Sequence, residues 1–193
     1  MLKHSVFIFT SYFMFTLPIN LQRLVDIKTI CPSCSVELKY ASTDNFTGKR
    51  LYNFSQCLVL KEVALQLYKV QLDLEKNGLG LKIWDGFRPL SVQVFFWDSI
   101  LDKRYVSPPE VARHTRGTAI DVTLTNIEGK LLAMPSLFDD FSERAHRNYR
   151  GATHEERTNS ALLENFMTKH GFIGLSTEWW HFDLCGWEKY PII

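Results

Sequence analysis

The sequence lacks the features that mark nucleic-acid-binding or repetitive proteins. Its formal net charge is only +1 over 193 residues, and its lysines and arginines are scattered rather than gathered in a basic tract. No internal repeat or low-complexity segment is present. A chain of this length can bury a core without disulfides or a structural metal. We therefore expect one globular domain with no nucleic-acid partner, in which any bound metal serves chemistry rather than folding.

Charge is also absent from one apolar run near the N-terminus. Ser5–Ile19 is aromatic and aliphatic, and it is flanked by Lys3 and Arg23. The run is short for a membrane-spanning helix and suits an export signal, although no small-x-small cleavage site follows it. We predict a signal peptide or N-terminal anchor at residues 1–24 and a folded domain at 25–193. This predicts a periplasmic or secreted protein that contacts a membrane only through the N-terminal segment; a cytoplasmic chain with a buried N-terminal helix or strand is the alternative.

Cysteine is scarce, with four residues in the chain. Cys31 and Cys34 have the spacing of a redox pair or of half a zinc knuckle. A second pair is missing, because Cys57 and Cys185 stand alone. An exported chain could join Cys31 to Cys34 in a disulfide. Alternatively, the two are simply small residues at the start of the domain.

Hydrophobic spacing predicts an α+β domain in which a small antiparallel sheet is flanked by helices. The expected helices are Leu58–Glu75, Ser91–Asp98 with Ser91 as its cap, and Thr158–His170. The expected strands are Val36–Tyr40, Leu79–Trp84, Thr118–Leu124, Phe172–Leu175 and Trp179–Leu184.

The segment from His114 to Asp121 carries an imidazole and a carboxylate on either side of Gly117. The glycine and the β-branched residues argue against one helix holding both ends. The two side chains can still meet if the histidine lies on a loop and the aspartate points inward from the following strand. Both groups are good ligands for a borderline divalent metal. A surface histidine and an unrelated strand aspartate are the other interpretation.

A second segment, Glu178-Trp-Trp-His181, carries an acid and a histidine three residues apart. In a regular strand these would point to opposite faces, so they converge only if the glutamate lies on the loop that enters the strand. A glutamate that is not a ligand but lies near metal-bound water is the usual general base of a metallopeptidase. Alternatively, the pair belongs to the core beside the two tryptophans.

A third segment, Asp85–Pro89, contains Arg88 immediately before a proline. Proline favours an extended backbone at the residue before it, which could present the guanidinium rigidly. Such a group can stabilise the oxyanion that develops when a carbonyl is attacked. A salt-bridged turn is the alternative.

Taken together, these segments resemble the D-alanyl-D-alanine dipeptidases of the vancomycin-resistance type, within the zinc D,D-peptidase family. The resemblance runs from about residue 36 to residue 184. The matching stretches are Leu38–Gly48, Trp84–Pro89, Arg113–Leu124, Phe138–His146 and Glu178–His181. It implies a fold of the D,D-peptidase/hedgehog-like kind, with a zinc site at the sheet, and it makes residues 25–193 a zinc dipeptidase domain.

The resemblance also implies a role for each site residue. His114, Asp121 and His181 would hold one Zn²⁺ per chain and leave a fourth position for water. Glu178 would take the proton from that water and later pass it to the leaving amine. Arg88 would steady the tetrahedral intermediate.

Substrate recognition is implied for two further residues. Asp139, with Tyr40, would meet the free ammonium of the substrate. The sequence departs from the family at Ala112, where relatives usually have a serine that helps to position the substrate. This departure leaves the metal ligands intact and bears on substrate fit.

The implied reaction is hydrolysis of the D-Ala-D-Ala dipeptide to free D-alanine. Alternatives on the same scaffold are a D,D-carboxypeptidase that acts on peptidoglycan stem peptides, an L,D-type endopeptidase, or an inactive cell-wall-binding relative. Glu178 argues against the inactive form, whereas Ala112 argues mildly for it. A redox protein built on Cys31 and Cys34 would explain none of the other segments.

An exported enzyme would recycle wall fragments for nutrition, and a cytoplasmic one would support glycopeptide resistance. The sequence does not set the oligomeric state.

Overall fold

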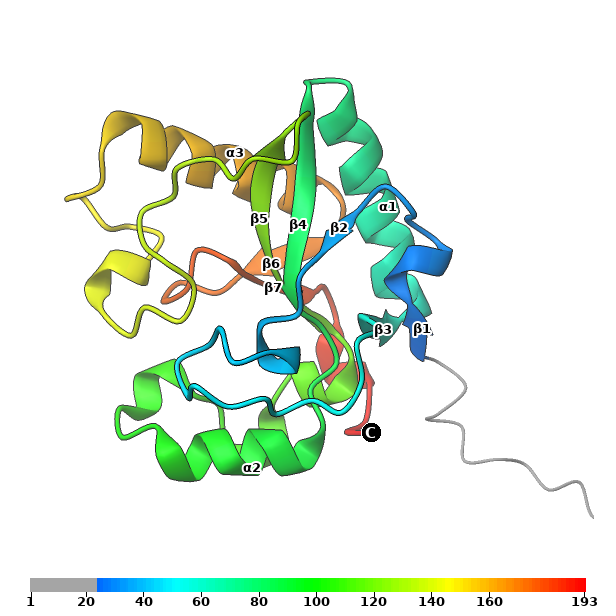
Figure 1. Cartoon of the computed structure of the whole chain (residues 1–193), viewed down its shortest axis with the longest axis vertical. Helices are drawn as coiled ribbons and strands as arrows, with labels where there is room; N and C mark the ends of the chain where they lie inside the picture. Colours follow the sequence, from blue (N-terminus) through cyan, green and yellow to red (C-terminus); the bar gives the residue numbers. More distant parts are fainter. Residues whose placement is uncertain (1–23) are drawn as a thin grey trace, which may run out of the picture.

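The computed structural model describes residues 24–193 of the chain. Helices and short strands follow one another in a single domain, which confirms the predicted α+β class (Figure 1). The predicted signal peptide or anchor lies outside the described residues, apart from Leu24, which begins the first strand. Within residues 24–193, no helix combines the length and the apolar character needed to cross a membrane.

A five-stranded sheet runs through the domain in the order β2-β4-β5-β7-β6 (Figure 1). Three neighbouring pairs, β4–β5, β5–β7 and β7–β6, are antiparallel as predicted. The edge strand β2 is parallel to β4, because the long crossover between them returns the chain in the same direction. The strands are β2 (Ser35–Val36), β4 (Leu79–Asp85), β5 (Ala119–Asn126), β6 (Phe172–Gly174) and β7 (His181–Leu184).

A separate two-stranded antiparallel sheet pairs β1 (Leu24–Asp26) with β3 (Leu58–Leu60). The first helix, α1 (Lys61–Glu75), follows β3 directly. The predicted helix over Leu58–Glu75 therefore begins three residues too early. The apolar β3 residues suit a strand or a helix equally well, and their partner β1 lies more than thirty residues upstream, beyond any local window.

Two helices, α1 and α3 (His154–Lys169), contact each other and the sheet (Figure 1). Thr153 caps α3 through a reciprocal capping box with Glu156, which defines where that helix begins. The apolar residues of α1 recur at helical spacing and are buried, which explains why this helix was predictable from the sequence. These residues are Val63, Ala64, Leu67, Val70 and Leu74.

The remaining helix, α2 (Leu90–Ser99), lies at the lower end of the molecule in Figure 1, away from α1 and α3. It begins directly after Pro89, so the predicted cap at Ser91 is wrong. The carbonyl of Pro89 accepts hydrogen bonds from the backbone N–H groups of Val92 and Gln93 at 2.9 and 3.1 Å. Because proline fixes φ near the helical value, the helix can begin directly after Pro89.

The central strand β5 is buried along nearly its whole length. Alternate residues of a strand point to opposite faces of the sheet. Ile120, Val122 and Leu124 belong to the apolar core. Asp121 and Thr123 occupy the intervening positions and line cavities instead. One face of the sheet is therefore packed core, and the other presents polar groups for chemistry.

Candidate metal and catalytic site

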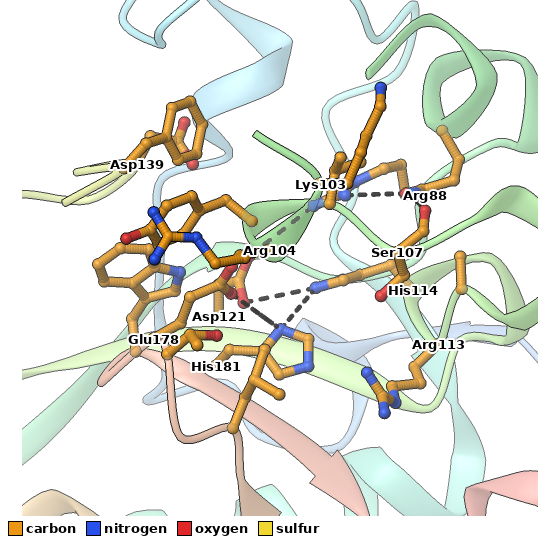
Figure 2. A pocket seen from close by; sticks show the side chains of 18 of the residues that line it. Arg88, Lys103, Arg104, Ser107, Arg113, His114, Asp121, Asp139, Glu178 and His181 are labelled. Carbon is orange, nitrogen blue, oxygen red and sulfur yellow. Dashed lines mark hydrogen bonds and ion pairs between the residues drawn. The ribbon is translucent and has the colours of Figure 1, made fainter. Parts of the chain in front are cut away.

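A cavity of about 280 Å³ lies over the polar face of β5. It brings together side chains that are far apart in the sequence (Figure 2). All seven predicted site residues line it: Tyr40, Arg88, His114, Asp121, Asp139, Glu178 and His181.

The two histidines and the aspartate come from three different local structures. His114 begins a single 3-10 turn that ends at Gly117, whose φ of 67° is left-handed. A Cβ at Gly117 would lie 2.7 Å from Leu24 Cδ2 and 3.3 Å from the backbone nitrogen of Leu60, so the left-handed φ and the close neighbours both favour glycine in this turn. Asp121 on β5 and His181 on β7 are direct cross-strand partners. The local arrangement that the sequence required, a histidine in a turn and an aspartate in a strand, is present.

The three groups converge tightly. His114 Nε2 lies 3.2 Å from His181 Nδ1. Asp121 Oδ1 lies 3.1 Å from His181 Nδ1 and 3.4 Å from His114 Nε2. These three side chains, all buried, form a group that could hold a metal ion, with the ligand atoms within 4.8 Å of one another.

In each histidine ring, the outer nitrogen, which faces away from the other two groups, is hydrogen-bonded. The inner nitrogen, which faces them, is therefore available as a metal ligand. His114 Nδ1–H donates to the carbonyl oxygen of Gly86 at 2.7 Å. His181 Nε2–H donates to Asp183 Oδ1 at 2.9 Å. With both outer positions protonated, neutral rings direct two lone pairs and one carboxylate oxygen at a common centre. Such groups repel one another unless a cation lies between them, and this donor set suits zinc.

Charge in the site is set by burial and by close partners. Burial opposes ionisation of Asp121, but His114 and His181 hold its pKa well below the usual range. Burial would lower the pKa of His181, but Asp183 and Asp121 outweigh it and raise the pKa to about 10. A metal therefore competes with a proton for Nδ1 of His181.

Glu178 lies in the turn that enters β7 rather than in the strand itself. Its carbonyl accepts from His181 N–H, and its Oε2 is 3.8 Å from His181 Nδ1. Burial raises the pKa of Glu178, an effect that the nearby His181 partly offsets. A glutamate whose pKa is raised toward neutrality is well suited to accept and return a proton.

Arg88 is salt-bridged and also lies beside the two histidines and the aspartate. The predicted salt-bridged turn and a guanidinium placed to stabilise an oxyanion are therefore compatible. Its Nε and Nη2 donate to Asp85 Oδ2 at 3.2 and 2.8 Å, and its Nη1 donates to Gln93 Oε1 at 3.0 Å. Nη2 also lies 3.9 Å from Asp121 Oδ2. Tyr52 OH donates to the other oxygen of Asp85 at 2.7 Å. A buried network thus fixes the guanidinium beside the metal-ligating group.

Asp139 and Tyr40 meet at another part of the same cavity. Tyr40 OH donates to Asp139 Oδ1 at 2.9 Å, and its oxygen lies 3.1 Å from Oδ2. Asp139 has a φ of 58°, which is uncommon for a residue other than glycine. Burial raises the pKa of its carboxyl group to about 8, although Tyr40 opposes the shift. A strained, reluctantly ionised carboxylate is often retained for function.

Four residues near the site were missed by the sequence analysis. Asp85 and Asp183 could have been found, because Asp85 opens the segment that contains Arg88, and Asp183 follows His181 by two residues on the predicted strand Trp179–Leu184. Tyr52 gave no signal, because its partner Asp85 is distant along the chain. Gln93 gave none, because its role depends on how α2 is oriented. Ala112, the noted departure, is buried and lines the cavity.

Comparisons with a family model and with curated proteins point to the same family. The family model described as D-ala-D-ala dipeptidase (Peptidase_M15) matches residues 20–191. A D-alanyl-D-alanine dipeptidase from Escherichia coli (strain K12) is 40% identical over 171 residues, covering 88% of this chain and 89% of the relative. A relative of the same name from Enterococcus faecalis (strain ATCC 700802 / V583) is 35% identical over 177 residues, covering 80% and 87%.

Among solved structures, one described as the LdcB LD-carboxypeptidase aligns with a TM-score of 0.49 and 19% sequence identity. The alignment covers 89% of this chain and 70% of that chain.

The burial of Asp139 gives a stability prediction. The pKa of its carboxyl group is about 8 in the folded chain, against about 3.9 for an ordinary aspartate. Between these values the folded state keeps a proton that the unfolded state releases, so this group's contribution to stability is lost as pH rises from about 4 to about 8. Asp139→Asn removes that loss. We expect its Tm to exceed that of the wild type by an amount that grows over this range, as followed by circular dichroism. Asp140→Asn is the matched control, and parallel Tm curves for Asp139→Asn and the wild type would contradict the assignment.

Proposed function

The chain belongs to the D-Ala-D-Ala dipeptidase family, and on that premise we propose that it hydrolyses D-Ala-D-Ala to two molecules of D-alanine, as a zinc metallopeptidase. His114, Asp121 and His181 hold the zinc. The observation that carries the proposal is the convergence of two imidazole nitrogens and one carboxylate oxygen on one centre, beside a half-buried glutamate.

The protein's own groups supply the proton transfers and the charge stabilisation. Zinc, when bound, acts as a Lewis acid that increases the acidity of water and polarises a carbonyl. Glu178 takes a proton from the attacking water and delivers it to the amine that leaves. Arg88, fixed by Asp85, donates to the oxyanion that forms as the peptide carbonyl is attacked. Removing a donor of this kind typically costs on the order of 10²–10³ in rate.

Substrate recognition uses the part of the cavity formed by Asp139 and Tyr40. An ammonium group there pairs with Asp139 and compensates for the burial that otherwise raises its pKa. A dipeptide has a free ammonium next to the scissile bond, whereas a longer stem peptide has an amide at that position. This arrangement therefore favours the dipeptidase over the D,D-carboxypeptidase. Ala112 offers no hydroxyl to the substrate, so the chain binds it without the contact that a serine there would provide.

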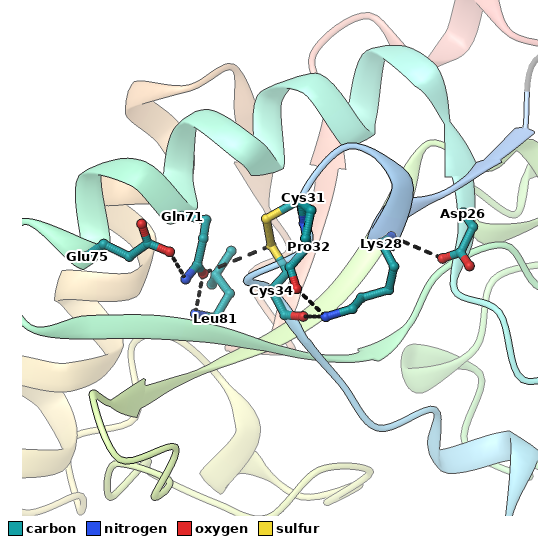
Figure 3. Close-up of a disulfide and its surroundings, with 8 residues drawn as sticks. All are labelled: Asp26, Lys28, Cys31, Pro32, Cys34, Gln71, Glu75 and Leu81. Carbon is teal, nitrogen blue, oxygen red and sulfur yellow. Dashed lines mark hydrogen bonds between the residues drawn. A yellow bond between two sulfur atoms is a disulfide. The ribbon is translucent and has the colours of Figure 1, made fainter.

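A disulfide near the start of the domain supports an exported location. Cys31 and Cys34 are joined, with their Cα atoms 5.5 Å apart, and both are fully buried (Figure 3). Lys28 Nζ donates to the carbonyl of Cys34 at 2.8 Å and to that of Pro32. Disulfides persist in oxidising compartments. Because this bridge is buried, it is poorly placed to exchange with other thiols, which argues for a structural role rather than a redox role. We propose a periplasmic or secreted enzyme that recycles wall peptides, with the N-terminal segment as its export signal or anchor and its only contact with a membrane.

The roles of ligand and base can be separated by two substitutions. Glu178→Ala is expected to bind one zinc per chain and to lose turnover, because it removes the proton carrier and leaves the ligands in place. His114→Ala is expected to lose zinc. Metal content by atomic emission and D-alanine release measured with and without a chelator check both. Full activity in Glu178→Ala, or unchanged zinc content in His114→Ala, would reject the assigned roles.

Substrate length can be tested with three peptides. We expect kcat/KM for D-Ala-D-Ala to exceed that for N-acetyl-D-Ala-D-Ala and for a stem pentapeptide by on the order of 10²-fold or more, because both lack the ammonium that pairs with Asp139. Asp139→Asn should reduce this ratio. D-alanine release is the measurement, and equal rates on dipeptide and pentapeptide would instead identify a carboxypeptidase.

The location can be tested in cells. The full chain is expected outside the cytoplasm with Cys31 and Cys34 oxidised, and a chain lacking residues 1–23 is expected in the cytoplasm with both reduced. Cell fractionation followed by thiol alkylation and mass spectrometry reports both properties at once. Recovery of the full chain in the cytoplasm with free thiols at these positions would overturn the proposal.

A further inference from the structure

The two metal-facing histidines are oriented by different kinds of group. His114 donates its outer N–H to the main-chain carbonyl of Gly86, a partner that no side-chain substitution removes. His181 donates its outer N–H to the side chain of Asp183 at 2.9 Å. The ring of His181 therefore depends on one replaceable residue, which lies two positions further along β7 and so on the same face of the strand.

Asp183 is itself held in place. It is buried, and its second oxygen, Oδ2, lies 3.2 Å from Nε of Arg113. Arg113 immediately precedes His114 and packs against the ring of Trp187, with 4.8 Å between the guanidinium carbon and the ring centroid. The ion pair between Arg113 and Asp183 therefore runs alongside the contact between His114 and His181. It joins the turn that carries one ligand to the strand that carries another.

We propose that Asp183, anchored by Arg113, is the positioning residue that fixes the ring of His181 and so sets how tightly the protein holds zinc. The inference rests on the proposed metal site. A carboxylate behind a metal-ligating histidine selects the tautomer, holds the ring plane and increases the basicity of the ligand nitrogen. Arg113 does the same one step further out, by keeping the carboxylate in place.

Substitution by asparagine tests this without changing the size of the side chain. Asp183 accepts from His181 Nε2–H through Oδ1, and its Oδ2 forms an ion pair with Arg113, 3.2 Å from Nε. An amide has one oxygen and no charge, so Asp183→Asn loses the ion pair with Arg113 and either keeps an acceptor for His181 or turns an NH₂ group toward it. In both orientations the side chain is no longer anchored by the charge of Arg113, and in one of them the histidine also loses its acceptor.

A second histidine–carboxylate pair provides the matched control. His170 Nε2 lies 2.9 Å from Asp73 Oδ2, the same separation as in the His181–Asp183 pair, but it connects α1 with the end of α3, away from the cavity. Asp73→Asn therefore makes the same chemical change without touching the metal site.

The experiment measures zinc affinity and release in full-length wild type, Asp183→Asn and Asp73→Asn. Competition with a chromogenic chelator gives the dissociation constant, and transfer of zinc to excess chelator gives the release rate. We expect Asp183→Asn to bind zinc about 10–100-fold more weakly and to release it faster. Asp73→Asn should match the wild type. Circular dichroism of the metal-free proteins establishes that all three are folded.

Arg113→Gln provides a second route if Asp183→Asn does not fold. It should weaken zinc binding less than Asp183→Asn, and the double variant should bind no more weakly than Asp183→Asn alone, since both act through one contact. Zinc affinity within about threefold of wild type in Asp183→Asn, or an equal loss in Asp73→Asn, would overturn the inference. A wild-type protein that binds no zinc would instead refute the proposed function.

Discussion

Asp121 and His181 face each other across the antiparallel pair β5–β7, and the rest of the site depends on this register. A slip of one residue in that pairing would turn every side chain of one strand to the opposite face. Asp121 would then enter the apolar core occupied by Ile120 and Val122. The hydrophobic pattern of β5 thus fixes the position of a proposed metal ligand, because the side chains that bury the core and the carboxylate at the site alternate along the same strand.

Asp85 connects this metal centre to the neighbouring groups. It is fully buried, yet it binds Arg88, accepts from Tyr52 and lies 3.6 Å from Nδ1 of His114. A buried carboxylate is costly unless it is paired and hydrogen-bonded, and here each oxygen has partners. The negative charge of Asp85 balances the guanidinium, so that Arg88 can remain in a water-poor cavity and still donate.

Local patterns in the sequence predicted what is local in the structure. The α+β class, α1 and the central strands follow from hydrophobic periodicity. The seven predicted site residues, which line one cavity, were chosen by their segments and by resemblance to a family. Contacts between distant segments were not predictable in the same way. The strand β3 was absorbed into α1 because its partner β1 lies far upstream. Tyr52 was missed because only the folded chain brings it to Asp85.

The close packing of Leu24 against Gly117 has a consequence for shortened forms of the chain. The side chain of Leu24, at the start of β1, packs against the turn that carries His114. Removing this leucine would open space behind the turn. Trimming at the N-terminus is thus constrained by the needs of the catalytic centre, and any shortened version made for expression has to begin at or before this leucine.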